Sequence, residues 1–184
     1  GGESMDNIEV EYAKSKGIHV INTPNAFAKS VAELVFAHFL TLIRFLHDSN
    51  RNMPLEGDTK FAFLKKSYKK ATELSGKTLG IIGFGNIGKE VAKIGIGLGM
   101  KIIFYSRKPK TDTISLEFFD GRTIDFEFTS TNDMEAFLKE VDFISINTSE
   151  TTEYIIDTPE FEMMKDGVFI VNTAKGGVIN EVTL

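Results

Sequence analysis

The chain has 184 residues, of which 42% are hydrophobic and 26% charged, a composition typical of a globular protein that buries a sizeable core. Its formal net charge of −5 argues against a nucleic-acid partner, because phosphate binding needs a concentrated positive surface. The absence of cysteine excludes disulfides and cysteine-based metal sites, and it favours a cytoplasmic location. The longest apolar run, residues 31–43, has about 13 residues where a membrane span needs about 20, so no membrane partner is expected.

The N-terminal region predicts a short helix and a strand. Residues 8–16 have a helical pattern, and Gly17 follows as a C-cap because glycine readily adopts the left-handed conformation that ends helices. Residues 18–21 predict a strand, and residues 22–25 have the composition of a turn.

A long helix is predicted from Ser30 to about residue 50. Ser30 and Glu33 have the spacing of a capping box. The helix is apolar on nearly every side, so we expect a second copy of the chain to cover the surplus face and form a homodimer. His38 lies in this apolar run and is expected to be a core or interface residue. The Lys-rich residues 51–72 predict a solvated connector that consists of a loop, with or without a short helix.

From Lys77 onward, strands and helices alternate, which predicts a doubly wound parallel α/β sheet of the Rossmann type. The expected strands are 78–82, 101–105, 142–147 and 168–172, and the expected helices are 86–98, 133–140 and 159–164. Residues 107–130 are expected to be irregular, with a hairpin turn at 118–122.

The segment Gly83-Phe84-Gly85-Asn86-Ile87-Gly88 joins a predicted strand to a predicted helix and fits a dinucleotide-binding fingerprint. Gly83 permits the tight turn, Gly85 lets a pyrophosphate approach the backbone, and Gly88 lets the helix pack closely on the strand. The free amides at the start of the helix, helped by its dipole, would bind the pyrophosphate. The alternative is a glycine-rich turn without a ligand.

The end of the strand at 101–105 bears on the choice between NAD and NADP. An acidic residue about 20 positions after the start of the glycine motif would bond the ribose 2′-hydroxyl of NAD. This chain has Ser106-Arg107-Lys108 there instead, and these side chains suit the 2′-phosphate of NADP. The segment therefore favours NADP. In the alternative, Arg107 stacks on the adenine or lies in solvent, and NAD is used.

Two further strand ends carry candidate site residues, because open α/β sheets bind ligands at the carboxyl ends of their strands. Asn147 and Thr148 end one strand and are expected near the nicotinamide ribose. Lys175 follows the strand at 168–172 and is expected to bind substrate, against the alternative of an ordinary loop lysine.

Residues 73–88 resemble the D-2-hydroxyacid dehydrogenase family, especially phosphoglycerate dehydrogenases. Three further segments match in order: Met5-Asp6-Asn7-Ile8 with residues 17–24, Val31-Ala32-Glu33 with Arg44, and Asn172-Thr173-Ala174-Lys175-Gly176-Gly177. The resemblance implies an oxidoreductase that transfers a hydride between nicotinamide C4 and carbon 2 of a small hydroxy or keto acid. It also implies that residues 1–22 are the tail of a flavodoxin-like substrate domain and residues 23–184 a Rossmann domain truncated at its C-terminus.

The resemblance also assigns residue roles. It places Thr173 and Ala174 beside the cofactor, and it places Lys175 where the family has the arginine that holds the substrate carboxylate. The family's catalytic glutamate and histidine come after this segment, and none of the three histidines present matches by motif or forms a convincing zinc set. The 184 residues are therefore expected to bind cofactor without turning over substrate. Because lysine replaces the arginine, a non-catalytic dinucleotide-sensing regulatory protein of the same fold stays open as an alternative.

Overall fold

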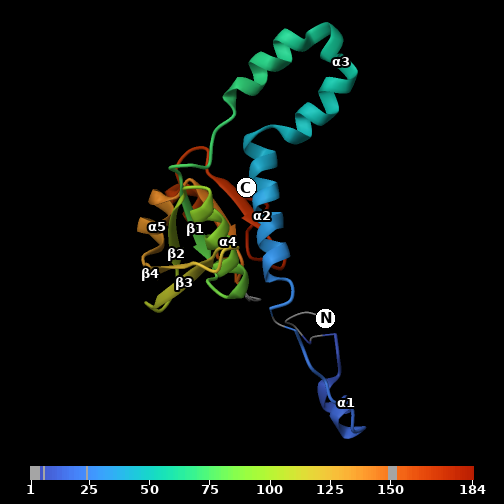
Figure 1. The fold of residues 1–184 in the computed structure, drawn as a ribbon, viewed down its shortest axis with the longest axis vertical. Helices are drawn as coiled ribbons and strands as arrows, with labels where there is room; N and C mark the ends of the chain where they lie inside the picture. The colour runs from blue at the N-terminus through green and yellow to red at the C-terminus, as the bar shows by residue number, and fades with distance from the viewer. Residues whose placement is uncertain (1–4, 6, 24, 149–152) are drawn as a thin grey trace.

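The computed structural model describes residues 5, 7–23, 25–148 and 153–184, and its centre is a four-stranded parallel sheet (Figure 1). The strands run in the order β2-β1-β5-β6, with bounds β1 (Thr78–Ile82), β2 (Lys101–Tyr105), β5 (Phe143–Ile146) and β6 (Phe169–Asn172). All three strand pairings are parallel, so the four carboxyl ends meet at one edge of the sheet. The predicted Rossmann-type α/β fold is confirmed, and these strands lie within one residue of their predicted bounds.

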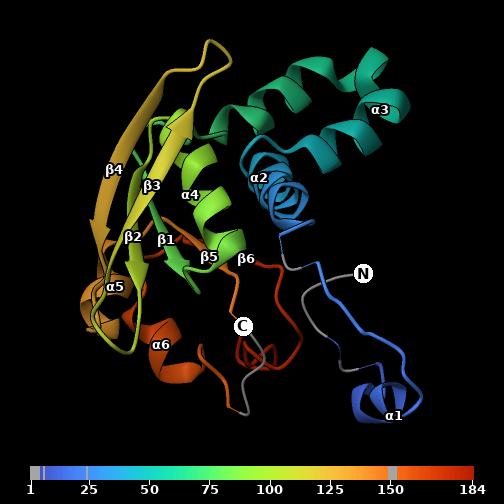
Figure 2. The same ribbon diagram turned by 60° about the horizontal axis from the view of Figure 1, so that its bottom comes forward.

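Helices cover both faces of the sheet, as the predicted doubly wound arrangement requires. α2 (Ala28–Ile43) and α4 (Asn86–Gly97) lie on one face, and α5 (Met134–Glu140) and α6 (Thr158–Met163) lie on the other (Figure 2). Side chains alternate along a strand, so Leu79 and Ile81 of β1 pack into the core with α2 and α4, while Ile82 packs into the core with α5. Burial on both faces explains why the strands are nearly continuous apolar runs.

A β-hairpin occupies most of the segment that was expected to be irregular. β3 (Thr111–Glu117) pairs antiparallel with β4 (Thr123–Thr129), so the prediction for residues 107–130 was wrong. The predicted turn at 118–122 is confirmed, and the Phe118 amide donates to the Arg122 carbonyl over 2.8 Å. Only Ile114 of the hairpin is fully buried, in the core shared with α4, so the strands carry a weak apolar signal.

The predicted helix from Ser30 to residue 50 is two helices that meet at Phe45. Phe45 has a φ of 55°, a left-handed conformation that turns the chain between α2 and α3 (Leu46–Ser67). The predicted capping box was also wrong, because α2 begins earlier, with Phe27 at its N-cap. The Ser30 hydroxyl donates back to the Phe27 carbonyl over 3.0 Å, so it caps no amide of the helix start.

Residues 44–71, which we call the arm, protrude from the sheet as α3 and the short 3-10 helix η1 (Tyr68–Lys70) (Figure 1). The prediction that residues 51–72 are mainly a loop was therefore wrong, whereas their expected exposure to solvent is confirmed. Within α3 only Leu64 is buried, so the helix lacks the apolar stripe by which a sequence pattern identifies one. The arm is closed at its base, where the Thr72 amide donates to the Ile43 carbonyl over 3.3 Å and Phe45 stacks on Tyr68.

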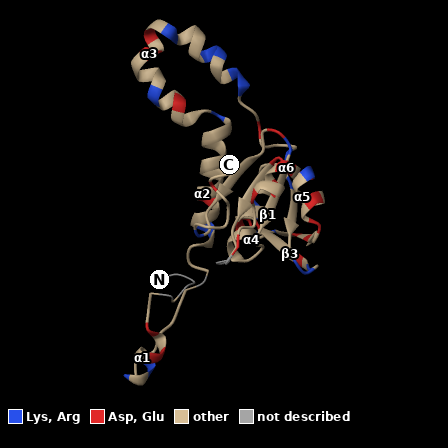
Figure 3. Cartoon of the chain, turned by 180° about the vertical axis from the view of Figure 1, so that it is seen from behind, with Lys and Arg blue, Asp and Glu red and all other residues tan. Residues whose placement is uncertain are grey.

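Charged residues of both signs are spread along α3, whereas α2 is mainly uncharged (Figure 3). In the part of the chain that the structure describes, no single helix has the length and apolarity to cross a membrane. Only α2 taken together with residues 46–70 meets that test, as a pair bent by 51°.

The N-terminal region lies away from the sheet (Figure 2). The predicted short helix is confirmed as α1 (Val10–Ser15), and Gly17 follows it with a φ of 74°. The strand predicted at 18–21 was wrong, since these residues pair with no neighbouring strand in the described structure. The predicted turn at 22–25 includes Pro24, which is outside the described residues; the Ala26 amide donates to the Thr23 carbonyl next to it.

Candidate functional site

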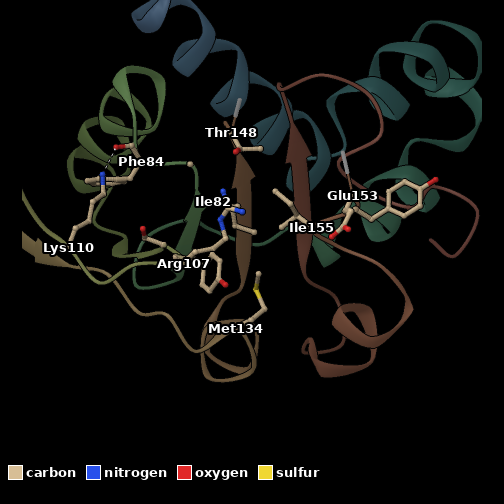
Figure 4. A pocket seen from close by; sticks show the side chains of 12 residues that line it. Ile82, Phe84, Arg107, Lys110, Met134, Thr148, Glu153 and Ile155 are labelled. Carbon is tan, nitrogen blue, oxygen red and sulfur yellow. Dashed lines mark hydrogen bonds between the residues drawn. The ribbon is translucent and has the colours of Figure 1, made fainter. Parts of the chain in front are cut away.

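A cavity of about 590 Å³ opens at the carboxyl ends of β1 and β2, within the size range of small-molecule sites (Figure 4). Five of its lining residues were predicted from the sequence: Gly83, Phe84, Ser106, Arg107 and Thr148. Seven others were not: Ile82, Tyr105, Lys110, Met134, Glu153, Tyr154 and Ile155. The cavity therefore joins the glycine-rich turn to the end of β2, which are the two parts that the sequence assigned to a dinucleotide.

The three glycines of the turn have different surroundings. Gly83 has a φ of 93°, and a Cβ there would lie 2.6 Å from the backbone of Asn147 and Thr148. At Gly88 a Cβ would lie 2.2 Å from the Gly83 carbonyl oxygen, so any side chain would push α4 away from the turn. At Gly85 no atom lies within 4 Å of a Cβ position, so the backbone there is open to an approaching ligand.

The other residues of the turn contribute mainly backbone to the site. Phe84 is buried, and its ring stacks on Phe104 with centroids 3.9 Å apart. Ile87 packs against the same core, and Asn86 is exposed at the first position of α4. Gly85 is the N-cap of α4 and brings no side chain to satisfy the first amides of the helix. Those amides and the helix dipole suit an anionic group such as a pyrophosphate.

The end of β2 forms another wall of the cavity. Tyr105, Ser106 and Arg107 line it, and the Arg107 side chain extends toward Ile82 (Figure 4). The Ser106 amide donates to the Thr131 carbonyl over 3.0 Å, which fixes the backbone after the strand. Lys108 is exposed and does not line the cavity.

Lys110 is a cation of the site that the sequence reasoning missed. Its ammonium nitrogen Nζ donates to the Phe84 carbonyl over 3.2 Å and lies 5.8 Å from the centroid of the Phe84 ring (Figure 4). Lys110 Nζ is also 3.5 Å from Asp112 Oδ2. The other oxygen of that carboxylate, Oδ1, accepts a 2.6 Å hydrogen bond from Lys89. Its closeness in sequence to Arg107 and Lys108 could have suggested Lys110 as a site residue. Its contact with the glycine-rich turn, however, depends on the hairpin, which was not predicted.

Asp112 is held ionised by its neighbours. Partial burial acts to raise the pKa of its carboxyl, but the hydrogen bond from Lys89 and the charges of Lys89 and Lys110 together lower that pKa below its ordinary value. The two lysines and one carboxylate carry a net positive charge beside the glycine-rich turn.

The ends of β5 and β6 are joined by side-chain hydrogen bonds. Asn147 Oδ1 accepts from the hydroxyls of Ser145 and Thr173, each over 3.2 Å. Ser145 is fully buried, so this network satisfies its hydroxyl inside the protein. Of the residues predicted here, only Thr148 lines the cavity, while Asn147 and Thr173 tie the two strand ends together.

The loop after β6 carries Ala174 and Lys175. The Ala174 amide donates to Asn172 Oδ1 over 3.0 Å, and the Asn172 side-chain amide donates to the Lys175 carbonyl over 3.4 Å. Lys175 is exposed, and neither it nor Ala174 lines the cavity. The loop has a fixed backbone beside the sheet edge that carries the site. Across the described residues, no three histidine, aspartate or glutamate side chains gather in a way that could hold a metal ion.

The comparisons with known proteins agree with this geometry. The family described as D-isomer specific 2-hydroxyacid dehydrogenase, NAD binding domain, matches residues 36–184. The chain is 45% identical over 186 residues to a hydroxypyruvate reductase from Thermotoga maritima, covering 100% of this chain and 54% of that protein. It is 36% identical over 189 residues to a glyoxylate reductase from Thermococcus litoralis, covering 95% of this chain and 51% of that protein.

A solved structure is also similar. It is a D-lactate dehydrogenase from Aquifex aeolicus complexed with NAD and lactic acid, with 32% identity and a TM-score of 0.66. The match covers 97% of this chain and 50% of that one. The chain thus spans about half the length of the relatives that it matches.

Proposed function

The chain belongs to the D-isomer-specific 2-hydroxyacid dehydrogenase family through its NAD-binding domain, and on this premise we propose that it binds a nicotinamide dinucleotide for hydride exchange with a small 2-hydroxy or 2-keto acid. The observation that carries the proposal is the open backbone at Gly85, where α4 begins beside the cavity of about 590 Å³. The residues present fit the cofactor, since an uncapped helix start meets a cavity with cationic side chains. When bound, the nicotinamide supplies or accepts the hydride.

Each part of the cavity has a role in this proposal. The first amides of α4 bind the pyrophosphate, and Ser106 and Arg107 bind the adenosine ribose. Thr148, at the end of β5, faces the nicotinamide ribose. Asn147 and Thr173 hold the strand ends in place, and Ala174 continues the same edge.

NADP is the proposed cofactor in preference to NAD. No carboxylate follows β2 directly, and Ser106 and Arg107 both line the cavity. An arginine can contact a 2′-phosphate with two donors, whereas it gains less from a 2′-hydroxyl. Lys108 does not line the cavity and adds only a nearby positive charge.

The proposed substrate is a small 2-keto or 2-hydroxy acid whose carboxylate is bound by Lys175. Lys175 follows β6 at the sheet edge where ligands of open α/β sheets bind. The resemblance of residues 73–88 favours phosphoglycerate, and the relatives named above are reductases of hydroxypyruvate and glyoxylate. All three compounds carry the same carboxylate next to the reacting carbon. Residues 23–184 act as the cofactor domain in this proposal, and turnover is a property of the whole enzyme.

A homodimer through α2 and the arm is part of the proposal. Leu55 of α3 is 81% exposed and Phe63 is 67% exposed, and both lie on the protruding arm (Figure 1). Leu34 and Leu42 of α2 are about half exposed. Large exposed apolar side chains on neighbouring elements are typical of a protein–protein interface. The exposed apolar surface that was expected on one long helix is therefore divided between α2 and α3.

A non-catalytic dinucleotide sensor is the second candidate function. It is favoured by Lys175, because a lysine cannot make the two-pronged carboxylate contact of an arginine. Both candidates require dinucleotide binding, and they differ in whether a 2-keto acid is reduced. A substrate screen with the whole protein and saturating cofactor separates them, since a sensor gives no turnover with any 2-keto acid.

The first test is a paired titration of the purified chain with NADPH and NADH, followed by the fluorescence of the nicotinamide. The chain contains no tryptophan, so energy transfer from indole does not contribute to the signal. We expect both nucleotides to bind, with NADPH binding more tightly. Equal or tighter binding of NADH would contradict the NADP preference, and binding of neither would contradict the proposed function.

A further inference from the structure

Lys110 connects the hairpin to the glycine-rich turn. The Phe84 carbonyl that accepts from its Nζ lies between Gly83 and Gly85, in the part of the backbone that would face a pyrophosphate. The ammonium also lies 5.6 Å from the centroid of the Phe104 ring, beside the stacked rings of Phe84 and Phe104. The lysine therefore contacts the turn through both its backbone and its aromatic side chain.

A second contact holds the other side of the same turn. Lys89 lies in the first turns of α4, and its ammonium donates to Asp112 Oδ1 over 2.6 Å. Lys110 immediately precedes β3 and Asp112 is its second residue. This end of the hairpin therefore contacts the chain before Gly85, at Phe84, and after it, at Lys89. Both charged groups of this second contact are about a third exposed or less, so solvent screens them only in part.

The hairpin is well fixed where it makes these contacts. The Lys110 amide donates to the Ser130 hydroxyl over 2.9 Å, and the Ser130 amide donates back to the Lys110 carbonyl over 2.9 Å. Ile114 anchors the same strand in the core. These contacts fix the start of β3. From this fixed segment Lys110 contacts Phe84 in the turn, and Asp112 contacts Lys89 in α4.

We propose that Lys110 is a positioning residue that holds the Gly83–Gly85 backbone in the conformation that binds a dinucleotide pyrophosphate, and that Asp112 holds both Lys110 and the start of α4 in place. The inference rests on the proposed function, because it concerns how the same turn is prepared for its ligand. A turn of glycines is intrinsically mobile, so an external contact that fixes it lowers the cost of ordering it on binding.

A competing interpretation is that Lys110 only attracts the phosphates of the cofactor by its charge. The two interpretations predict opposite changes in nucleotide affinity when Asp112 is substituted. If charge alone matters, Asp112→Asn removes a negative charge near a polyanion and tightens binding. If Asp112 positions the turn, the same change weakens binding. In either case the substitution keeps the size of the side chain.

The binding test measures NADH and NADPH affinity for the unsubstituted chain, Lys110→Met, Lys110→Arg and Asp112→Asn. We expect Lys110→Met to weaken both nucleotides by a similar factor, roughly three- to tenfold, since one charge-assisted hydrogen bond is lost. Lys110→Arg should restore most of the affinity, and Asp112→Asn should weaken both nucleotides. Lys139→Met is the matched control, because it removes an exposed lysine that pairs with Glu135 on α5, and it should change neither affinity.

Loss of NADPH affinity alone in Lys110→Met, or tighter binding in Asp112→Asn, would overturn the positioning role. If the unsubstituted chain binds neither nucleotide, the proposed function itself fails. Hydrogen exchange without any nucleotide then tests the positioning separately: Lys110→Met should accelerate exchange of the amides from Lys89 onward in the first turns of α4 and leave β5 unchanged. Unchanged exchange at α4 would show that Lys110 does not hold the turn.

Discussion

The amide of Thr78, the first residue of β1, donates a 2.9 Å hydrogen bond to a carboxylate oxygen of Asp142, the residue before β5. Lys165 donates to the other oxygen of the same carboxylate over 3.0 Å and also to the Glu140 carbonyl. Burial acts to raise the pKa of Asp142, but the hydrogen bonds from Thr78 and Lys165 and the nearby lysine charges outweigh it and lower that pKa. The ionised carboxylate therefore joins two central strands at the edge opposite the site.

Replacement of Asp142 by alanine should destabilise the fold by about 2 kcal/mol, because a strand amide loses its partner. Since the folded pKa is below the ordinary value of 3.8, the ionised group stabilises the protein above about pH 4, and this contribution is lost as the pH falls through the lower folded value. Urea unfolding between pH 7 and pH 3 measures this contribution: the difference in the free energy of unfolding between the unsubstituted chain and Asp142→Ala should shrink on acidification. Glu135→Ala, at an exposed ion pair, is the control and should change stability by less than about 0.5 kcal/mol. A difference that stays constant with pH would contradict the assignment.

Alanine at Gly88 should lower the stability of the fold, whereas alanine at Gly85 should lower the affinity for nucleotide. A Cβ at Gly88 would lie 2.2 Å from the Gly83 carbonyl oxygen, so Gly88→Ala should destabilise the fold by roughly 1–3 kcal/mol. At Gly85 a Cβ meets nothing within 4 Å, so Gly85→Ala should keep the unfolding midpoint but weaken NADPH binding about tenfold or more, because the methyl group occupies the approach of the pyrophosphate. Thermal unfolding and nucleotide titration on the same samples separate the two effects. Undiminished NADPH affinity in Gly85→Ala would place the pyrophosphate elsewhere.

Arg107→Ala should reduce NADPH affinity by roughly ten- to hundredfold, as expected for loss of a paired charge-assisted contact, and should change NADH affinity little. Ser106→Asp should reverse the preference, because a carboxylate accepts from the 2′-hydroxyl and repels the 2′-phosphate. Arg122→Ala, which removes an exposed arginine paired with Asp120 at the hairpin turn, is the matched control. If Arg107→Ala weakens NADH as much as NADPH, the arginine contacts a part common to both nucleotides, such as the adenine.

Phe63→Glu should dissociate the proposed homodimer, because a charge would be buried in an apolar contact. The side chain is 67% exposed in one chain, so the substitution should change the stability of the monomer little. Sedimentation equilibrium measures the mass directly. Phe119→Glu is a matched control, since Phe119 is fully exposed at the hairpin turn, away from the arm. A monomeric unsubstituted chain, or an unchanged dimer in Phe63→Glu, would contradict the interface.

The sheet and the glycine-rich turn were predictable because their signals are local. Buried parallel strands are apolar runs of four or five residues, and the spacing of the glycines at 83, 85 and 88 can be recognised within one strand-turn-helix unit. The end of β2 was located for the same reason. Of the three glycines, only Gly88 is constrained within that unit, by the Gly83 carbonyl, whereas Gly83 lies against the distant end of β5. The sequence patterns of these parts can be recognised without knowledge of their distant neighbours.

The parts that were missed depend on contacts between distant segments. Lys110 reaches Phe84 across 26 positions of sequence, and only the hairpin brings the two together. The arm was taken for a loop because α3 buries little and contains Pro54, which usually argues against a helix interior. The break between α2 and α3 rests on one left-handed phenylalanine, a residue type whose sequence preference gives no sign of that conformation.

The Gly83 backbone lies so close to Asn147 and Thr148 that a Cβ would be 2.6 Å from their backbone, and this has a consequence for protein engineering. This close approach locks the glycine-rich turn to the end of β5, so these two segments form a single unit that has to be transplanted together between homologous scaffolds. Tyr105, Ser106 and Arg107 line the cavity from a different strand. We therefore expect that the short segment proposed to select the cofactor can be exchanged on its own, while the proposed pyrophosphate site stays with the glycine-rich turn and the end of β5.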